Sequence, residues 1–167
     1  FRDHVAVGSH PFSWGNPPDV HCCNTVDGQG WDDNPVFFFS DTLEDYRNIM
    51  VRNGHTDVKL WATEFGWATW DEFPGDPPET WMSYTNKWQQ AEYTLRAFEI
   101  GQQTDYLGTM ILWNMNFAWL PGLVENRDER AAYSLLTRLK PQQERPLYWM
   151  LYDAVRPDVH LDRYDAG

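Results

Sequence analysis

Three short apolar segments, separated by segments with helical periodicity, constrain the fold of this chain more than any other feature. These near-continuous apolar runs lie at residues 5–9, 58–67 and 107–114. Runs of this length are typical of buried strands. Strands that alternate with helices pair in parallel, and continuously apolar strands are expected where both faces of the sheet are covered. The sequence therefore predicts an α/β fold with a parallel sheet.

Apolar residues at helical spacing predict the elements between these strands. The first helix begins with a capping-box pattern at Asp41 and Glu44 and ends near Gly54. The second follows one apolar stripe through residues 81, 84, 88, 91, 95 and 98. Asn86 and Gln89 offer a cap inside that stripe, so we expect the regular helix to start near residue 86.

Two further segments complete the outline. A charged loop at residues 125–130 precedes a last helix over residues 146–155, whose first turn suits Pro146. Residues 13–35 form a long loop rich in Pro and Gly that contains Trp14 and Trp31. Loops of this length are functional or disordered, and the two Trp residues favour function. Three acidic residues of this loop could hold a surface Ca²⁺: Asp27, Asp32 and Asp33. Acidic loops are more often simply solvated.

Charge and composition exclude several classes of protein. The chain carries 13 Lys and Arg against 25 Asp and Glu, a formal net charge of −12. That balance argues against binding nucleic acid or an anionic membrane surface, because both require clustered Lys and Arg. No apolar run approaches the length of a transmembrane helix. Phe, Tyr and Trp make up 16% of the residues, which excludes intrinsic disorder.

The two cysteines, Cys22 and Cys23, are adjacent in the sequence. Neighbouring cysteines seldom bond to each other, because a disulfide requires separated, converging Cβ atoms. The pair also lacks the CxxC spacing of a zinc site, even with His21 beside it. We therefore expect free or buried thiols, and the redox compartment stays open.

The ends of the three strands carry the residues with chemical potential. In parallel α/β folds, ligands bind at the carboxyl ends of the strands, and here these ends are His10, Glu64 and Trp113. A carboxylate at the end of an apolar strand is unfavourable without partners or a function, so Glu64 is the strongest candidate. For His10 and Trp113 the alternatives are a structural histidine and a core tryptophan.

Residues 60–67, Leu-Trp-Ala-Thr-Glu-Phe-Gly-Trp, resemble the seventh strand of clan A glycoside hydrolases, which are retaining enzymes on a (β/α)8 barrel. Residues 8–12 resemble the sixth strand of that clan. Residues 90–93 and 111–114 resemble the helix and the eighth strand that follow, and residues 145–148 the start of the last helix. Family 39 is the closest, and family 5 shares the pattern. The likeness covers about residues 4–155.

This resemblance implies a role for each matching residue. Glu64 matches the catalytic nucleophile, His10 the residue that orients it, and Trp113 the indole that stacks under the sugar. Trp14 and Trp67 lie in or beside strand-end loops, where amphipathic indoles suit a sugar surface. Trp70 and Trp119 are placed likewise, whereas the tryptophans inside predicted helices are expected to pack: Trp81, Trp88 and Trp149.

The resemblance also implies that residues 1–167 are the carboxyl-terminal portion of such a barrel, covering about the sixth to eighth βα units, with no second domain. The clan's acid/base Glu lies in an Asn-Glu pair at the end of the fourth strand, and this chain has no counterpart. We therefore expect the chain alone to be inactive on its oligo- or polysaccharide substrate. Its exposed strand edges require the rest of the barrel, or another copy of the chain, to cover them.

Two other functions remain open. One is a non-catalytic carbohydrate-binding or interaction module that has the same aromatic cleft. The other is an unrelated hydrolase or metal enzyme, but the chain has no GxSxG, HExxH, phosphate-binding Gly loop or EF-hand spacing. We accordingly expect neither a cofactor nor a metal. The sugar and its linkage are not readable from this stretch.

Overall fold

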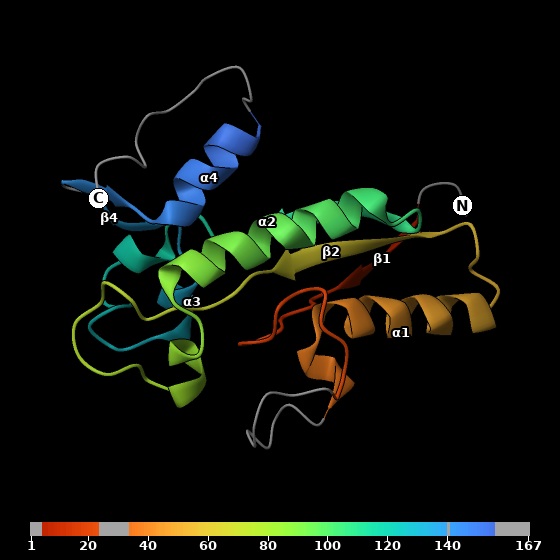
Figure 1. The fold of residues 1–167 in the computed structure, drawn as a ribbon, viewed down its shortest axis with the longest axis horizontal. Coiled ribbons are helices and arrows are strands. Elements are labelled where there is room, and N and C mark those ends of the chain that lie inside the picture. Colours follow the sequence, from red (N-terminus) through yellow and green to blue (C-terminus); the bar gives the residue numbers. More distant parts are fainter. Residues whose placement is uncertain (1–4, 24–33, 140, 156–167) are drawn as a thin grey trace.

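A computed structural model describes residues 5–23, 34–139 and 141–155 (Figure 1). Its central feature is a three-stranded sheet of β1 (Ala6–Ser9), β2 (Lys59–Phe65) and β3 (Leu107–Leu112). The strands lie in the order β1-β2-β3, and both neighbouring pairs are parallel. The predicted α/β fold with a parallel sheet is confirmed.

Helices connect consecutive strands, as predicted. Along the sequence, α1 (Phe39–Arg52) connects β1 to β2, and α2 (Lys87–Gln103) connects β2 to β3. α4 (Pro146–Ala154) packs against α2 (Figure 1). An antiparallel hairpin of β4 (Leu136–Leu139) and β5 (Gln142–Glu144), which the sequence analysis did not predict, precedes α4. The remaining elements are short: η2 (Pro35–Phe37), η3 (Thr80–Ser83), η4 (Phe117–Trp119) and α3 (Glu129–Ala132).

The two long helices start differently from each other. Asn86 caps α2: its side chain accepts from the backbone of Trp88 and Gln89, and the Gln89 side chain accepts from the Asn86 backbone. The predicted capping box is therefore confirmed. The one predicted at Asp41 is wrong, because α1 begins at Phe39 after an N-cap, Phe38, that makes no side-chain cap bond.

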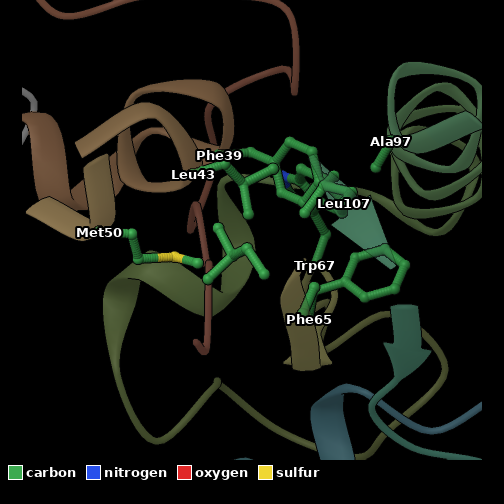
Figure 2. Packing of buried hydrophobic residues seen from close by; sticks show 9 residues of the cluster. Phe39, Leu43, Met50, Phe65, Trp67, Ala97 and Leu107 are labelled. Carbon is green, nitrogen blue, oxygen red and sulfur yellow. The ribbon is translucent and has the colours of Figure 1, made fainter. Parts of the chain in front are cut away.

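The main core lies between the sheet and the two long helices. Figure 2 shows side chains of α1, α2, β2 and β3 meeting in one cluster. Its buried members are Phe39, Leu43, Met50, Leu60, Ala62, Phe65, Trp67, Ala97 and Leu107. Burying one large apolar side chain contributes roughly 1.5–3 kcal/mol, so this cluster holds the helices on the sheet.

The other face of the sheet is open among the described residues. Leu60 and Ala62 are buried in the core, whereas the residue between them, Trp61, is 40% exposed. Its indole lies across Gly108, where a Cβ atom would approach the indole nitrogen to 2.5 Å. Ile111 of β3 is 48% exposed. The expectation of a sheet covered on both faces is wrong for the described part of the chain.

The adjacent cysteines differ from expectation as well. Cys22 and Cys23 form a disulfide with each other, so the prediction of free or buried thiols is wrong. The backbone N–H of Cys22 donates to Asp41 Oδ2 (2.6 Å), and His21 Nδ1 lies 2.5 Å from Asp41 Oδ1. Asp41 therefore anchors the cysteine segment instead of capping α1. None of the described helices has the length and apolar character needed to cross a bilayer.

Candidate functional site

A cavity of about 440 Å³ lies at the carboxyl ends of β2 and β3. Five of its lining residues are aromatic, two are acidic and one is basic: Phe12, Trp14, Trp81, Trp113, Tyr133, Glu64, Glu129 and Arg130. Three of the residues singled out from the sequence, Glu64, Trp14 and Trp113, are therefore brought together.

A bulge near the end of β2 positions Glu64. Ala62 pairs with Met110 and Phe65 pairs with Leu112, so β2 uses one more residue than β3 between these pairs. Residues three apart in a regular strand face opposite sides, but Ala62 and Phe65 both lie in the core. The extra residue allows this and leaves the Glu64 side chain, 33% exposed, in the cavity.

His10 follows β1 and lies beside Glu64, as expected. Its Nδ1 atom is 3.5 Å from Glu64 Oε2, a distance for an electrostatic contact rather than a short hydrogen bond. The imidazole is about half exposed and meets the edge of Phe12, with 6.5 Å between ring centroids. The ends of β1 and β2 thus place an imidazole next to the cavity carboxylate, although His10 itself is not among the residues that line the cavity.

A glycine allows the ends of β2 and β3 to approach each other closely. The backbone N–H of Trp113 donates to Phe65 O (2.9 Å), and a Cβ atom on Gly66 would lie 2.8 Å from Trp113 O. Any larger residue at position 66 would displace one of these two segments of the backbone. The Trp113–Asn114 peptide bond is cis. This approach puts the half-buried Trp113 indole and Glu64 into the same cavity.

Asn114 connects the segment after β3 to the segment that carries Arg130. Its amide donates to Arg130 O (2.9 Å), and its Oδ1 accepts from the Ser134 hydroxyl and the Phe117 backbone. One buried side chain thereby connects two segments that each carry a cavity-lining residue, Trp113 and Arg130.

Trp14 and Trp81 form an aromatic wall. Their rings are stacked, with 5.3 Å between centroids and 12° between planes, and Phe37 packs on Trp14 at 4.2 Å. Trp14 adopts a positive φ of 47°. Trp81, which we expected to pack inside a helix, instead lies in η3 before the start of α2. The cap at Asn86, from which we expected the regular helix to start near residue 86, places Trp81 outside α2.

Three of the expected sugar-facing tryptophans, Trp67, Trp70 and Trp119, are not among the residues that line the cavity, and Trp119 is 43% exposed outside it. Trp67 is 1% exposed, lies in the main core beside Phe39, and donates its indole N–H to Asn16 O (2.8 Å). The interpretation of Trp67 as substrate-binding does not fit this position. Trp70 is buried too. Trp88, expected to pack, is about half exposed on α2.

Tyr133 contributes a buried phenol that the sequence analysis missed. Burial raises the pKa of Tyr133 well above its usual range, so the phenol stays neutral at physiological pH. Its ring meets the edge of Phe12 at 5.2 Å. No spacing or motif marks Tyr133 in the sequence, because its place depends on the loop after β3.

A fully buried arginine, Arg145, joins the loops that form the wall. Its guanidinium donates to four backbone carbonyls of two separate segments: Ala132 and Ser134, then Thr69 and Asp71. Burial lowers the pKa of Arg145 to about 10, against the opposing effect of Glu72 and Asp71, so it remains charged at neutral pH. Arg145 thus links the loop after β2 to the turn that carries Tyr133.

One group of described residues has donor atoms close enough for a metal ion. The donor atoms of His21, Asp41 and Glu44 lie within 4.8 Å of one another. The Asp41 carboxylate is already satisfied by His21 and the Cys22 backbone, so these contacts explain the group without an ion. The Ca²⁺ candidates Asp27, Asp32 and Asp33 lie outside the described residues, as does Trp31.

Another cavity, of about 390 Å³, lies between α2, α4 and the end of β3. Its lining is almost wholly apolar and includes Phe98, Leu112, Leu135 and Leu151. It contains no carboxylate or imidazole, so we assign the candidate chemistry to the cavity of Glu64.

Comparisons with known proteins add no further assignment. No model of a known protein family matches the chain, and no curated protein matches it.

Proposed function

We propose that this chain supplies the nucleophile of a retaining glycoside hydrolase, as the carboxyl-terminal part of a (β/α)8 barrel. The supporting observation is the position of Glu64: a partly exposed carboxylate, 3.5 Å from His10, in an aromatic-lined cavity at the carboxyl ends of a parallel sheet. The resemblance of residues 60–67 to the clan A nucleophile strand points to the same residue.

The reaction requires two carboxyl groups on either side of the anomeric carbon. Glu64 attacks this carbon, so that a bond forms to its carboxylate oxygen while the bond to the leaving oxygen breaks and that oxygen takes a proton. Water then cleaves the glycosyl-enzyme and regenerates the carboxylate. His10 keeps Glu64 oriented, and the indole of Trp113 packs against the C–H face of the sugar.

The proton donor for the leaving oxygen is assigned to a residue outside this chain. Glu129 also lines the cavity, at the exposed start of α3, but the resemblance gives it no part in the chemistry. In this proposal the rest of the barrel, or a second copy of the chain, covers the sheet face at Trp61 and Ile111. It also covers the outer edges of β1 and β3, which pair with no further strand among the described residues.

The second candidate is a carbohydrate-binding module without catalysis. The aromatic wall of Trp14 and Trp81 favours it, since such a wall binds a sugar without any nucleophile. The two functions make different predictions for covalent chemistry at Glu64.

The test uses 2-fluoro glycosides with a dinitrophenolate leaving group, which departs without protonation and so needs no acid residue. A panel of gluco, galacto, manno and xylo forms is incubated with the chain, and the products are mapped by mass spectrometry. We expect one glycosyl group on Glu64, absent in Glu64→Gln and retained in the matched cavity variant Glu129→Gln.

Failure of every sugar to label Glu64, or labelling at another residue, contradicts the enzymatic proposal. If unlabelled sugars still shift the indole NMR signals of the cavity tryptophans, the binding module is the better assignment.

A further inference from the structure

The charges around the cavity limit which sugars can enter it. Glu64 and Glu129 are its acidic lining residues, and Arg130 is its basic one. His10 lies next to Glu64, with its Nδ1 atom 3.5 Å from Glu64 Oε2. The electrostatic character of the cavity therefore depends on whether the Arg130 guanidinium is available to a ligand.

Asp128 occupies the guanidinium of Arg130. Arg130 Nε donates to Asp128 Oδ1 (2.8 Å) and Arg130 Nη2 donates to Asp128 Oδ2 (2.7 Å). This is the two-point geometry in which arginine ordinarily binds a carboxylate or phosphate of a ligand. The pair lowers the pKa of the Asp128 carboxyl, so it stays ionised at neutral pH.

Asp128 is also fixed in place by the backbone. It is the N-cap of α3, and its Oδ1 accepts from the backbone N–H of Arg130 (3.0 Å). The carboxylate is therefore held where it blocks the guanidinium fork, and a ligand carboxylate would have to displace it. The net charge of −12 on the chain adds to the repulsion of anions.

We propose that this cavity takes uncharged sugars and rejects uronates, and that Asp128 sets the preference by neutralising Arg130. This inference rests on one part of the proposed function, namely that the cavity binds sugar, and it does not require catalysis. It assigns Asp128 a role in specificity through Arg130, with no contact to the substrate.

The test compares each neutral methyl glycoside of glucose, galactose and mannose with its own uronate. Binding is followed by the indole N–H signals of the cavity tryptophans in NMR titrations at low salt. For a sugar that binds, we expect the uronate to bind about threefold more weakly, since a like-charge contact near water is worth up to about 1 kcal/mol.

Asp128→Asn isolates the charge, because Asn is as good an N-cap as Asp. We expect this variant to reduce the discrimination against uronates by about threefold, in the range of one surface ion pair. Asp45→Asn, which removes the same charge from an exposed position on α1, is expected to leave the discrimination unchanged.

Arg130→Gln gives the opposing check. If Asp128 neutralises Arg130, this variant leaves the Asp128 carboxylate unpaired, so we expect the discrimination against uronates to rise by about threefold. Discrimination that stays unchanged in Asp128→Asn, or uronate binding equal to neutral binding in wild type, overturns the inference while the sugar site stands. Absence of binding by any neutral sugar overturns the sugar site and the inference together.

Discussion

Glu64 obtains its surroundings from three separate parts of the chain. His10 comes from the end of β1, Trp113 from the segment after β3, and Tyr133 from the turn after α3. The motif at residues 60–67 was sufficient to single out the carboxylate. The neighbours that matched strand ends, His10 and Trp113, were also predicted, whereas Tyr133 and Trp81 were not, because loop packing alone brings them to the cavity.

Arg145 is expected to be essential for stability. Arg145→Leu leaves four backbone carbonyls without their donor and removes the guanidinium from the Phe73 ring, which it contacts at 4.9 Å. We expect a loss of about 3 kcal/mol or more in the free energy of unfolding, as for other broken buried charge networks. Urea denaturation measures it. Arg52→Leu, at an exposed helix end, should change stability by about 0.5 kcal/mol or less; equal effects in the two variants would contradict the role assigned to Arg145.

The ion pair of His21 and Asp41 makes stability depend on pH. The hydrogen bond that His21 donates to the Asp41 carboxylate raises the pKa of His21 in the folded chain, with smaller contributions from Glu44 and Asp19. A raised folded pKa contributes stability that is fully present below the unfolded pKa of about 6.5 and is lost as the pH rises through the folded value.

The free energy of unfolding of wild type should therefore exceed that of His21→Asn by more at about pH 5.5 than at about pH 8.5. Because the imidazole is half exposed, the difference should stay below about 1 kcal/mol. Urea denaturation at both pH values measures it, with His55→Asn as the control for replacing an exposed histidine. A difference that grows with pH would contradict the assignment.

Among the elements, the start of α1 shows how burial overrides a local signal. Asp41 and Glu44 have the spacing of a capping box, yet the N-cap of α1 lies three residues earlier, at Phe38. Phe38 and Phe39 are both fully buried, and packing them requires the helix to start there. The signal at Asn86 succeeded because no such competing burial affects the exposed Asn86.

The cap of α2 yields a second stability prediction. Asn86→Ala removes the acceptor for the backbone N–H groups of Trp88 and Gln89. We expect a loss of about 1 kcal/mol in the free energy of unfolding. Thermal or urea denaturation measures it against Asn48→Ala, an exposed position inside α1 where Ala favours the helix. A cap variant as stable as this control would show that the capping bonds do not hold the end of α2.

The meeting of β2 and β3 could not be predicted from either strand alone. The bulge before Phe65 and the contact of Gly66 with Trp113 O each involve two strands. A sequence pattern marks an apolar run, but it does not reveal where a neighbouring strand requires an extra residue. The orientation of Glu64 toward the cavity therefore depends on a pairing that forms only in the folded sheet.

For the molecule as a whole, an open sheet face and a single assigned carboxylate lead to a negative prediction. We expect the 167-residue chain to show no turnover of alkyl glycosides, whose leaving groups need protonation, because an acid catalyst contributes about 10²–10⁴-fold. Release of free sugar is measured by chromatography against Glu64→Gln. Turnover that disappears in Glu64→Gln would show that the chain already contains its acid, with Glu129 the first residue to test.

The order of strands and helices, the parallel sheet, the position of Glu64 at a strand end and the cap of α2 all follow from the sequence, because they depend on periodicity and short-range hydrogen bonds. The uncovered sheet face, the burial of Trp67, the cysteine pairing and the aromatic wall of Trp14 and Trp81 required the tertiary structure. The physical reason is that the same residue type, tryptophan above all, is equally suited to a core and to a half-exposed cavity. Only the surrounding chain segments determine which of these environments each indole occupies.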